Sequence, residues 1–113
     1  ETGNGQPLVS YGVMGGDMQA QGHLQFITRL ALFNQNPQAV LDAPRFKVLN
    51  NREVCLEKNF PIRIVSDLET RGHNITYSDT AGFYGGGQAI YRLNTGKYVG
   101  ASDPRRDGQA VGF

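Results

Sequence analysis

The chain has 113 residues, of which 39% are hydrophobic and 19% are charged, as is typical of one globular domain rather than a disordered segment. Its formal net charge is +1, from 11 basic and 10 acidic side chains, so a dedicated nucleic-acid-binding protein is not expected. No stretch of about 18 apolar residues is present, and the sequence therefore predicts no transmembrane helix. The single cysteine, Cys55, excludes an internal disulfide and a cysteine-based metal site.

The first third of the chain predicts a strand followed by a helix. Residues 8–14 are mostly apolar and rich in β-formers, which favours a short buried strand, and Gly15-Gly16 ends it. Asp17 is a suitable N-cap, and the pattern from Met18 to about Phe33 is helical. The apolar positions of this helix follow the three-and-four spacing of one buried face: Met18, Phe26, Ile27, Leu30, Ala31 and Phe33.

The middle of the chain predicts two further helices and a hairpin. Residues 36–41 suit a short helix, because Asn-Pro at its start supplies a cap and a first-turn proline. Residues 46–56 suit a hairpin around a polar turn. Pro61 opens the next helix, and Gly72 supplies its C-terminal cap. Three apolar side chains are expected to share the buried face of that helix: Ile62, Val65 and Leu68.

The last third of the chain predicts strands. Residues 75–77 form a brief strand, and residues 88–93 and 97–102 are expected to pair around a glycine-containing loop at 94–96. The whole sequence therefore predicts an α+β fold with about five strands and two or three helices, in a single domain over residues 1–113.

The junction between the first strand and the first helix is the strongest candidate for chemistry. Two consecutive glycines, Gly15 and Gly16, allow the backbone to approach a ligand closely. The helix that follows leaves its first N–H groups without intrahelical partners, and its dipole adds partial positive charge at the same place. Such a turn suits an anion or the developing oxyanion of an acyl transfer. From the residues alone, a steric requirement for the glycines is the more common explanation of such a pair.

The other reactive side chains favour structural roles. His23 lies inside the first predicted helix, and His73 lies at the end of a later one. No pair of histidines has metal-ligand spacing, so no metal site is predicted. Cys55 has no basic neighbours to activate it and is expected to pack as a small apolar side chain. Ser10 and Ser102 lack the sequence of a nucleophile elbow.

Two loops in the second half of the chain also lack a catalytic pattern. The glycine-rich segment 82–87 is followed by a strand pattern and by no Gly-Lys-Ser/Thr sequence, so it does not predict a phosphate-binding loop. Asp103 and Asp107 flank Pro-Arg-Arg, which indicates a charged turn with local salt bridges rather than a carboxylate pair for acid–base catalysis.

Three segments resemble motifs of the γ-glutamyltranspeptidase family. Residues 13–23, with the sequence Val-Met-Gly-Gly-Asp-Met-Gln-Ala-Gln-Gly-His, are similar to the family's glycine motif in its acylase-like and amidohydrolase-like bacterial members. Residues 36–46 and 100–110 resemble the family's next conserved stretch and its C-terminal signature. The three segments occur in the family's order and span nearly the whole chain, so together they are more specific than any one of them.

The resemblance implies a fold and a mechanism. The family fold is a four-layer αββα sandwich of N-terminal-nucleophile hydrolases, made from a precursor that cleaves itself into a large and a small subunit. The new N-terminal threonine of the small subunit is the nucleophile, and its own α-amino group is the base, which suits an amine that titrates near neutrality. By resemblance, the backbone N–H groups of Gly15 and Gly16 hold the oxyanion, and no cofactor is required.

The resemblance also predicts what this chain lacks. The family's nucleophile lies several tens of residues before the glycine motif, whereas only 14 residues precede Gly15 here. Thr2 has the polar surroundings of a loop, not those of the nucleophile. We therefore expect the chain to be the C-terminal part of a small subunit, with the large subunit and the rest of the small subunit as partners. It would be inactive by itself and prone to form homo-oligomers through exposed sheet edges.

Two alternatives stay open at this level: a non-catalytic ligand-binding or interaction module that reuses the fold, and a segment that has no function apart from its parent protein. The acyl donor, a γ-glutamyl compound or another small amide, is not determined by the sequence.

Overall fold

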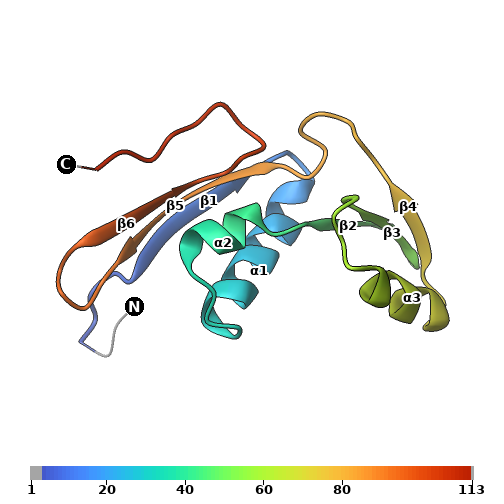
Figure 1. The fold of residues 1–113 in the computed structure, drawn as a ribbon, viewed down its shortest axis with the longest axis horizontal. Helices are drawn as coiled ribbons and strands as arrows, with labels where there is room; N and C mark the ends of the chain where they lie inside the picture. The colour runs from blue at the N-terminus through green and yellow to red at the C-terminus, as the bar shows by residue number, and fades with distance from the viewer. Residues whose placement is uncertain (1–3, 113) are drawn as a thin grey trace.

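The computed structural model describes residues 4–112, which form an α+β fold of six strands and three helices (Figure 1). The strands make two three-stranded sheets, one with the order β1-β5-β6 and the other with the order β2-β3-β4. In chain order the elements are β1 Val9–Met14, α1 Met18–Ala31, α2 Pro37–Asp42, β2 Phe46–Asn50, β3 Glu53–Leu56, α3 Ile62–Thr70, β4 Asn74–Tyr77, β5 Gly86–Arg92 and β6 Tyr98–Ser102.

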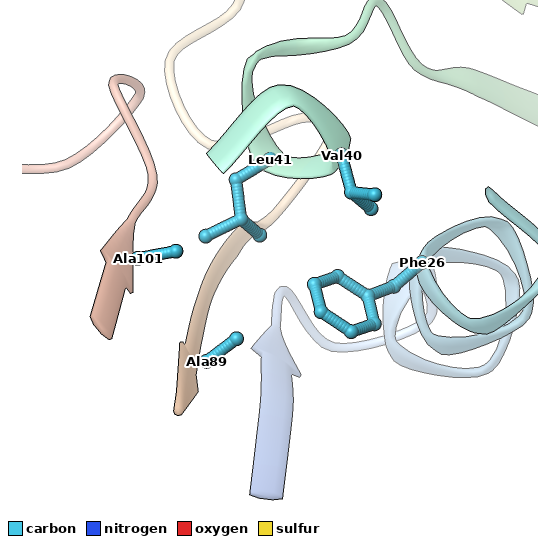
Figure 2. Packing of buried hydrophobic residues seen from close by; sticks show 5 residues of the cluster. All are labelled: Phe26, Val40, Leu41, Ala89 and Ala101. Atoms are coloured by element: carbon cyan, nitrogen blue, oxygen red, sulfur yellow. The ribbon is translucent and has the colours of Figure 1, made fainter. Parts of the chain in front are cut away.

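The first sheet is antiparallel throughout and has two different faces. In its register, Tyr11 pairs with Ala89, and Ala89 pairs with Ala101. Because alternate residues of a strand point to opposite faces, these three side chains share the inner face, which α1 and α2 cover. Figure 2 shows how Phe26 of α1 and Val40 and Leu41 of α2 pack toward Ala89 and Ala101 of the sheet. The small alanines allow the helices to lie close to the strands.

The second sheet is held by a smaller core with α3. β2 and β3 form an antiparallel hairpin, as predicted, whereas β4 pairs with β3 in the parallel direction. Val54 and Leu56 of β3 pack with Val65 of α3, and Phe60 lies against them. The prediction that Ile62 shares this buried face is wrong, because Ile62 is 77% exposed in the first turn and Phe60 packs against the core instead.

Helix α1 joins the two sheets through the side chains of two glutamines. Gln25 accepts from the backbone N–H of Phe46 (3.1 Å) and donates to its carbonyl oxygen (2.8 Å). One turn earlier, Gln21 makes the same pair of bonds with Val48 (2.8 and 3.0 Å). The outer edge of β2 is therefore paired with side-chain amides in place of another strand.

Most predicted elements are present, with corrections at the ends of α1. The helix ends at Ala31, and Phe33, expected on the buried face, is 67% exposed. The following Asn34 has φ 51°, a left-handed conformation that ends a helix. At the other end Asp17 occupies the N-cap position, but its side chain makes no capping hydrogen bond. The sequence predicts about five strands, and the structure has six.

The other helix ends follow the predicted chemistry. Asn36 caps α2 through its side-chain oxygen, which accepts from the N–H of Ala39 at 2.9 Å. Gly72, with φ 87°, ends α3, and the N–H groups of Gly72 and His73 donate back to Glu69 and Leu68. Within residues 4–112, no helix has the length and hydropathy that a membrane crossing requires.

Candidate functional site

The glycine turn lies between the end of β1 and the start of α1. Gly15 has φ 136° and Gly16 has φ 57°, so both positions use backbone conformations that side chains disfavour. The carbonyl oxygens of Gly15 and Gly16 accept from the N–H groups of Met18 and Gln19, each at 3.0 Å, and so begin the helix. Among residues 4–112, the N–H groups of Gly15 and Gly16 donate to no other group. The turn thus presents two unpaired donors at the positive end of the α1 dipole.

Close packing against Gly85 explains one of the two glycines. A Cβ atom on Gly15 would lie 2.8 Å from the Cα of Gly85, well inside van der Waals contact. Likewise, a Cβ on Gly85, where φ is 74°, would overlap the carbonyl oxygen of Met14. A Cβ on Gly16 would meet nothing within 4 Å, so this glycine faces open space. The steric explanation therefore accounts for Gly15, whereas at Gly16 only the backbone conformation favours glycine.

A buried carboxylate supports the segment that contains Gly85. Asp103 is 1% exposed, and one of its oxygens accepts from the backbone N–H of Gly87 at 2.8 Å and from the guanidinium of Arg45 at 2.6 Å. Arg45, also buried, donates in addition to the carbonyl oxygen of Tyr84 at 3.1 Å. Both ends of the segment 84–87 are thereby tied to one buried ion pair.

A second arginine extends the network. Arg105 bonds Asp103 through its side chain (3.0 Å) and through its backbone N–H (2.9 Å). Its guanidinium also makes two bonds to Glu57, at 2.6 and 2.5 Å, and reaches the carbonyl oxygens of Leu41 and Ala43. Arg45 belongs to the second family-like segment and Asp103 to the third, so the network joins two motifs through residues 58 positions apart.

Asp103 is ionised in this setting. Burial alone would raise the pKa of its carboxyl group. The N–H groups of Arg105 and Gly87 and the positive charges of Arg45 and Arg105 outweigh burial and hold the pKa below its ordinary value. The local part of the network, Asp103 with Arg105, confirms the predicted salt bridge of the charged turn. The long-range partner Arg45 was not predicted, because nothing in the local sequence marks Asp103 as buried.

The histidines and the cysteine have structural contacts. One ring nitrogen of His23 lies 2.6 Å from the carbonyl oxygen of Gln19, and the other accepts from the N–H of Val13 at 3.3 Å, so the ring joins α1 to β1. His73 belongs to the cap of α3. Cys55 is buried, as predicted, and its Sγ lies 3.2 Å from the hydroxyl of Tyr84. Burial and this thiol contact raise the pKa of Tyr84.

The remaining sequence candidates lie away from the glycine turn or carry no reactive arrangement. The hydroxyl of Ser102 donates to Gln88, and Ser10 is exposed on the outer face of the first sheet. Asp107 is exposed. In the described part of the chain, no three side chains of the metal-ligating types are grouped as a metal site. Thr2, whose surroundings in the sequence do not favour it as a nucleophile, lies outside the described residues.

Gly85 also lines a cavity of about 540 Å³. Most charged groups in its wall already have partners there or nearby: Arg105 bonds Glu57, Lys58 bonds Asp79, and Asp42 bonds Gln38. Neither Gly15 nor Gly16 lines this cavity. The candidate site is therefore the glycine turn with the segment that supports it, and the cavity does not enlarge it.

Comparison with known proteins places the same motifs in one family. The family model for gamma-glutamyltranspeptidase matches residues 1–113. The glutathione hydrolase-like YwrD proenzyme of Bacillus subtilis (strain 168) is 30% identical over 115 residues, which cover 96% of this chain and 22% of that protein. The oxamate amidohydrolase proenzyme of Klebsiella pneumoniae is 30% identical over 112 residues, covering 94% of this chain and 21% of that protein.

A solved structure agrees with the sequence comparisons. The crystal structure of cephalosporin acylase from Bacillus halodurans superposes with a TM-score of 0.87 at 46% identity, over 92% of this chain and 20% of that one. The chain thus spans about a fifth of the length of the curated relatives that it matches. Fold, motif order and family model agree, and the chain belongs to the gamma-glutamyltranspeptidase family of N-terminal-nucleophile hydrolases.

Proposed function

We propose that this chain supplies the oxyanion hole of an enzyme that hydrolyses or transfers a γ-glutamyl group or a similar acyl group. The backbone N–H groups of Gly15 and Gly16 would hold the negative oxygen of the tetrahedral intermediate. The observation that supports this role most directly is that both N–H groups are unpaired within the described residues and stand at the start of α1. Preformed donors of this kind stabilise charge that develops only in the transition state.

The reaction also needs a nucleophile, and we propose that a segment outside this chain supplies it. In the proposed mechanism, an N-terminal threonine of the small subunit attacks the amide carbonyl, and its α-amino group accepts the hydroxyl proton. The intermediate collapses to an acyl-enzyme and releases the amine, which takes up the proton. Water or an acceptor amine then attacks the ester, and the threonine hydroxyl is regenerated. The glycine turn would stabilise the oxyanion in both halves of the reaction.

The length of the relatives supports the place of this chain in a larger enzyme. The chain matches about a fifth of each curated relative, and both of those proteins are named proenzymes. We infer that it forms the C-terminal part of a small subunit and that it works with the large subunit and the remainder of the small one. The relatives act, by their names, on different amides, so the proposal is limited to a γ-glutamyl compound or another small amide as donor.

Activity measurements on the isolated chain and on the complete enzyme test whether the nucleophile lies outside this chain. The isolated 113-residue chain should not hydrolyse a γ-glutamyl anilide or a panel of small amides above the buffer rate. The complete enzyme that contains it should hydrolyse at least one of them with burst kinetics of an acyl-enzyme. Turnover by the isolated chain would refute the proposed role of an external threonine, and a complete but inactive protein would favour the binding module.

Two alanine substitutions in the complete enzyme test the oxyanion hole. Gly15→Ala would force the turn away from Gly85, so kcat should fall by about 10²-fold or more, as when an oxyanion donor is lost. Gly16→Ala meets no atom within 4 Å and costs only the left-handed backbone, so a smaller loss is expected. Equal, small effects of both variants on kcat would contradict the role of the turn.

A further inference from the structure

The geometry of the glycine turn depends on a segment that is distant in sequence. The backbone of Gly85 lies so close to Met14 and Gly15 that neither Gly15 nor Gly85 can carry a Cβ without a shift. Any displacement of Gly85 therefore moves the end of β1, where the two candidate oxyanion donors begin. The position of Gly85 is in turn fixed by what holds its neighbours in the chain.

The backbone groups of its neighbours form hydrogen bonds with two charged residues, Arg45 and Asp103. On one side, the carbonyl oxygen of Tyr84 accepts from Nη1 of Arg45 at 3.1 Å. On the other side, the N–H of Gly87 donates to Oδ2 of Asp103 at 2.8 Å, and the carbonyl oxygen of Gly87 accepts from the N–H of Asp103 at 3.1 Å. Arg45 and Asp103 bond each other at 2.6 Å, with side chains that are 5% and 0% exposed. Gly85 thus lies between two anchor points of one ion pair.

We propose that Arg45 and Asp103 are positioning residues for the glycine turn and act through the backbone of residues 84–87. The inference rests on the proposed function of Gly15 and Gly16. Arg45 and Asp103 themselves need not touch the substrate. They set the register of Gly85 against β1 and, through it, the direction in which the two glycine N–H groups point.

Energetics explain why a positioning role is a better account than stability alone. A buried ion pair contributes little net stability compared with apolar side chains of similar volume, because both charges lose their hydration. A guanidinium and a carboxylate, however, hold their partners at fixed angles through paired hydrogen bonds. Catalysis is sensitive to such angles, since a displacement of about 1 Å at a reacting group can cost roughly 10²-fold in rate.

The first variant keeps the charge of the ion pair and removes the hydrogen-bond geometry that includes Tyr84. Arg45→Lys in the complete enzyme keeps the positive charge beside Asp103. The lysine ammonium lacks the planar guanidinium, so it cannot bond Asp103 and the carbonyl oxygen of Tyr84 in the same geometry. We expect kcat per processed active site to fall by about 10- to 100-fold, with KM changed by less than about 3-fold. The matched control is Arg71→Lys, whose exposed pair with Asp67 lies on α3, and it should leave kcat unchanged.

A second variant guards against a loss of folding. Gly85→Ala leaves both charges in place and presses directly on the carbonyl oxygen of Met14. It should reproduce the loss of kcat with KM preserved, whereas Gly12→Ala, in the same strand as Met14 but with nothing within 4 Å of its Cβ, should not. If Arg45→Lys lowers the melting temperature and Gly85→Ala leaves kcat at the parent value, the network is structural only and the inference is overturned.

Different outcomes would contradict the oxyanion role of the glycine turn and the positioning role of Arg45 and Asp103. If the parent enzyme is active and Gly15→Ala abolishes activity while Arg45→Lys and Gly85→Ala have full kcat, the proposed function stands and the positioning role is wrong. If Gly15→Ala itself has full activity, the oxyanion role is wrong. Amide resonances of Gly15 and Gly16 that shift in Arg45→Lys but not in Arg71→Lys would support the positioning role independently of turnover.

Discussion

Asp103 is the centre of the buried hydrogen-bond network that joins Arg45, Gly87 and Arg105. Its two oxygens bond the side chains of Arg45 and Arg105 and the backbone N–H groups of Gly87 and Arg105. A carboxylate that accepts several charge-assisted bonds is favoured in its ionised form even when it is buried. The folded state therefore stabilises the charged form of this group more than the unfolded chain does.

Acid should weaken the fold through this carboxylate. The pKa of Asp103 is lowered in the folded state, so the unfolded chain binds the proton more readily. The contribution to stability is complete above the ordinary value of 3.8 and is lost as the pH falls from there through the folded pKa. Denaturant titrations between pH 7 and pH 2 should show the free energy of unfolding falling below about pH 4.

Asp103→Asn should remove this part of the acid dependence. It should also cost about 3–5 kcal/mol at pH 7, because the charge of Arg45 would stay buried without its partner. Asp79→Asn, which breaks an exposed pair with Lys58, is the control and should leave stability at pH 7 nearly unchanged. An Asp103→Asn protein as stable as the parent at pH 7 would contradict the account of the network.

At the residue scale, local patterns predicted some of these features and not others. The glycine turn was visible because a strand pattern stops at two glycines and a helix pattern starts directly after them. The pairing of Asp103 with Arg105 was predictable because the two residues are two positions apart in one turn. The burial of Asp103 and its bond to Arg45 depend on how α2 and β6 are brought together, which no local pattern encodes.

At the scale of elements, α1 contacts both sheets, and its sequence pattern predicts only one of these contacts. Its apolar face packs on the first sheet through Phe26, whose ring stacks on that of Tyr11. Its glutamines pair with the edge of β2 in the second sheet, so Gln25 is only 8% exposed although it is polar. Because the residues of this second contact surface are polar, the apolar periodicity of the helix does not predict it.

Gln25→Ala should destabilise the fold through the edge of β2. The N–H and carbonyl groups of Phe46 would lose their partners while still partly buried, at a cost of about 1–3 kcal/mol. Gln19→Ala, on the exposed side of the same helix, should change stability little. The measurement is the denaturant midpoint of each variant at unchanged slope. Equal midpoints for Gln25→Ala and the parent would show that α1 does not hold β2.

The elements themselves were largely predictable, and their partners were not. The two hairpins follow from turn residues between β-rich runs, and both are antiparallel in the structure. The pairing of β1 with β5, and the parallel pairing of β3 with β4, join segments separated by a helix or more. Such pairings depend on which apolar faces meet in space, so the single sequence predicted the strands without their order in the sheets.

On the scale of the whole molecule, the first sheet has one covered and one open face. α1 and α2 lie on the inner face, and the C-terminal segment crosses part of the outer face, where Gly100 lies close to Ala110 (Figure 1). Large apolar side chains on the outer face stay accessible: Met14 is 55%, Ile90 55% and Tyr98 69% exposed. Exposed apolar groups of this size on one sheet face are typical of a surface that packs against another part of a protein.

The open face makes a prediction for the chain in isolation. In a sandwich of two sheets the outer face would be covered by the other sheet, so the isolated chain should self-associate, and its mass by light scattering should rise with concentration. Ile90→Lys places a charge at the centre of this face, between Ser10 and Gly100 in the register, and should shift the chain toward monomer. Ile62→Lys, on the exposed first turn of α3, adds the same charge elsewhere and should not. A parent chain that stays monomeric at all concentrations would show that the outer face needs no cover. Equal effects of the two lysine substitutions would show that self-association depends on net charge and not on this face.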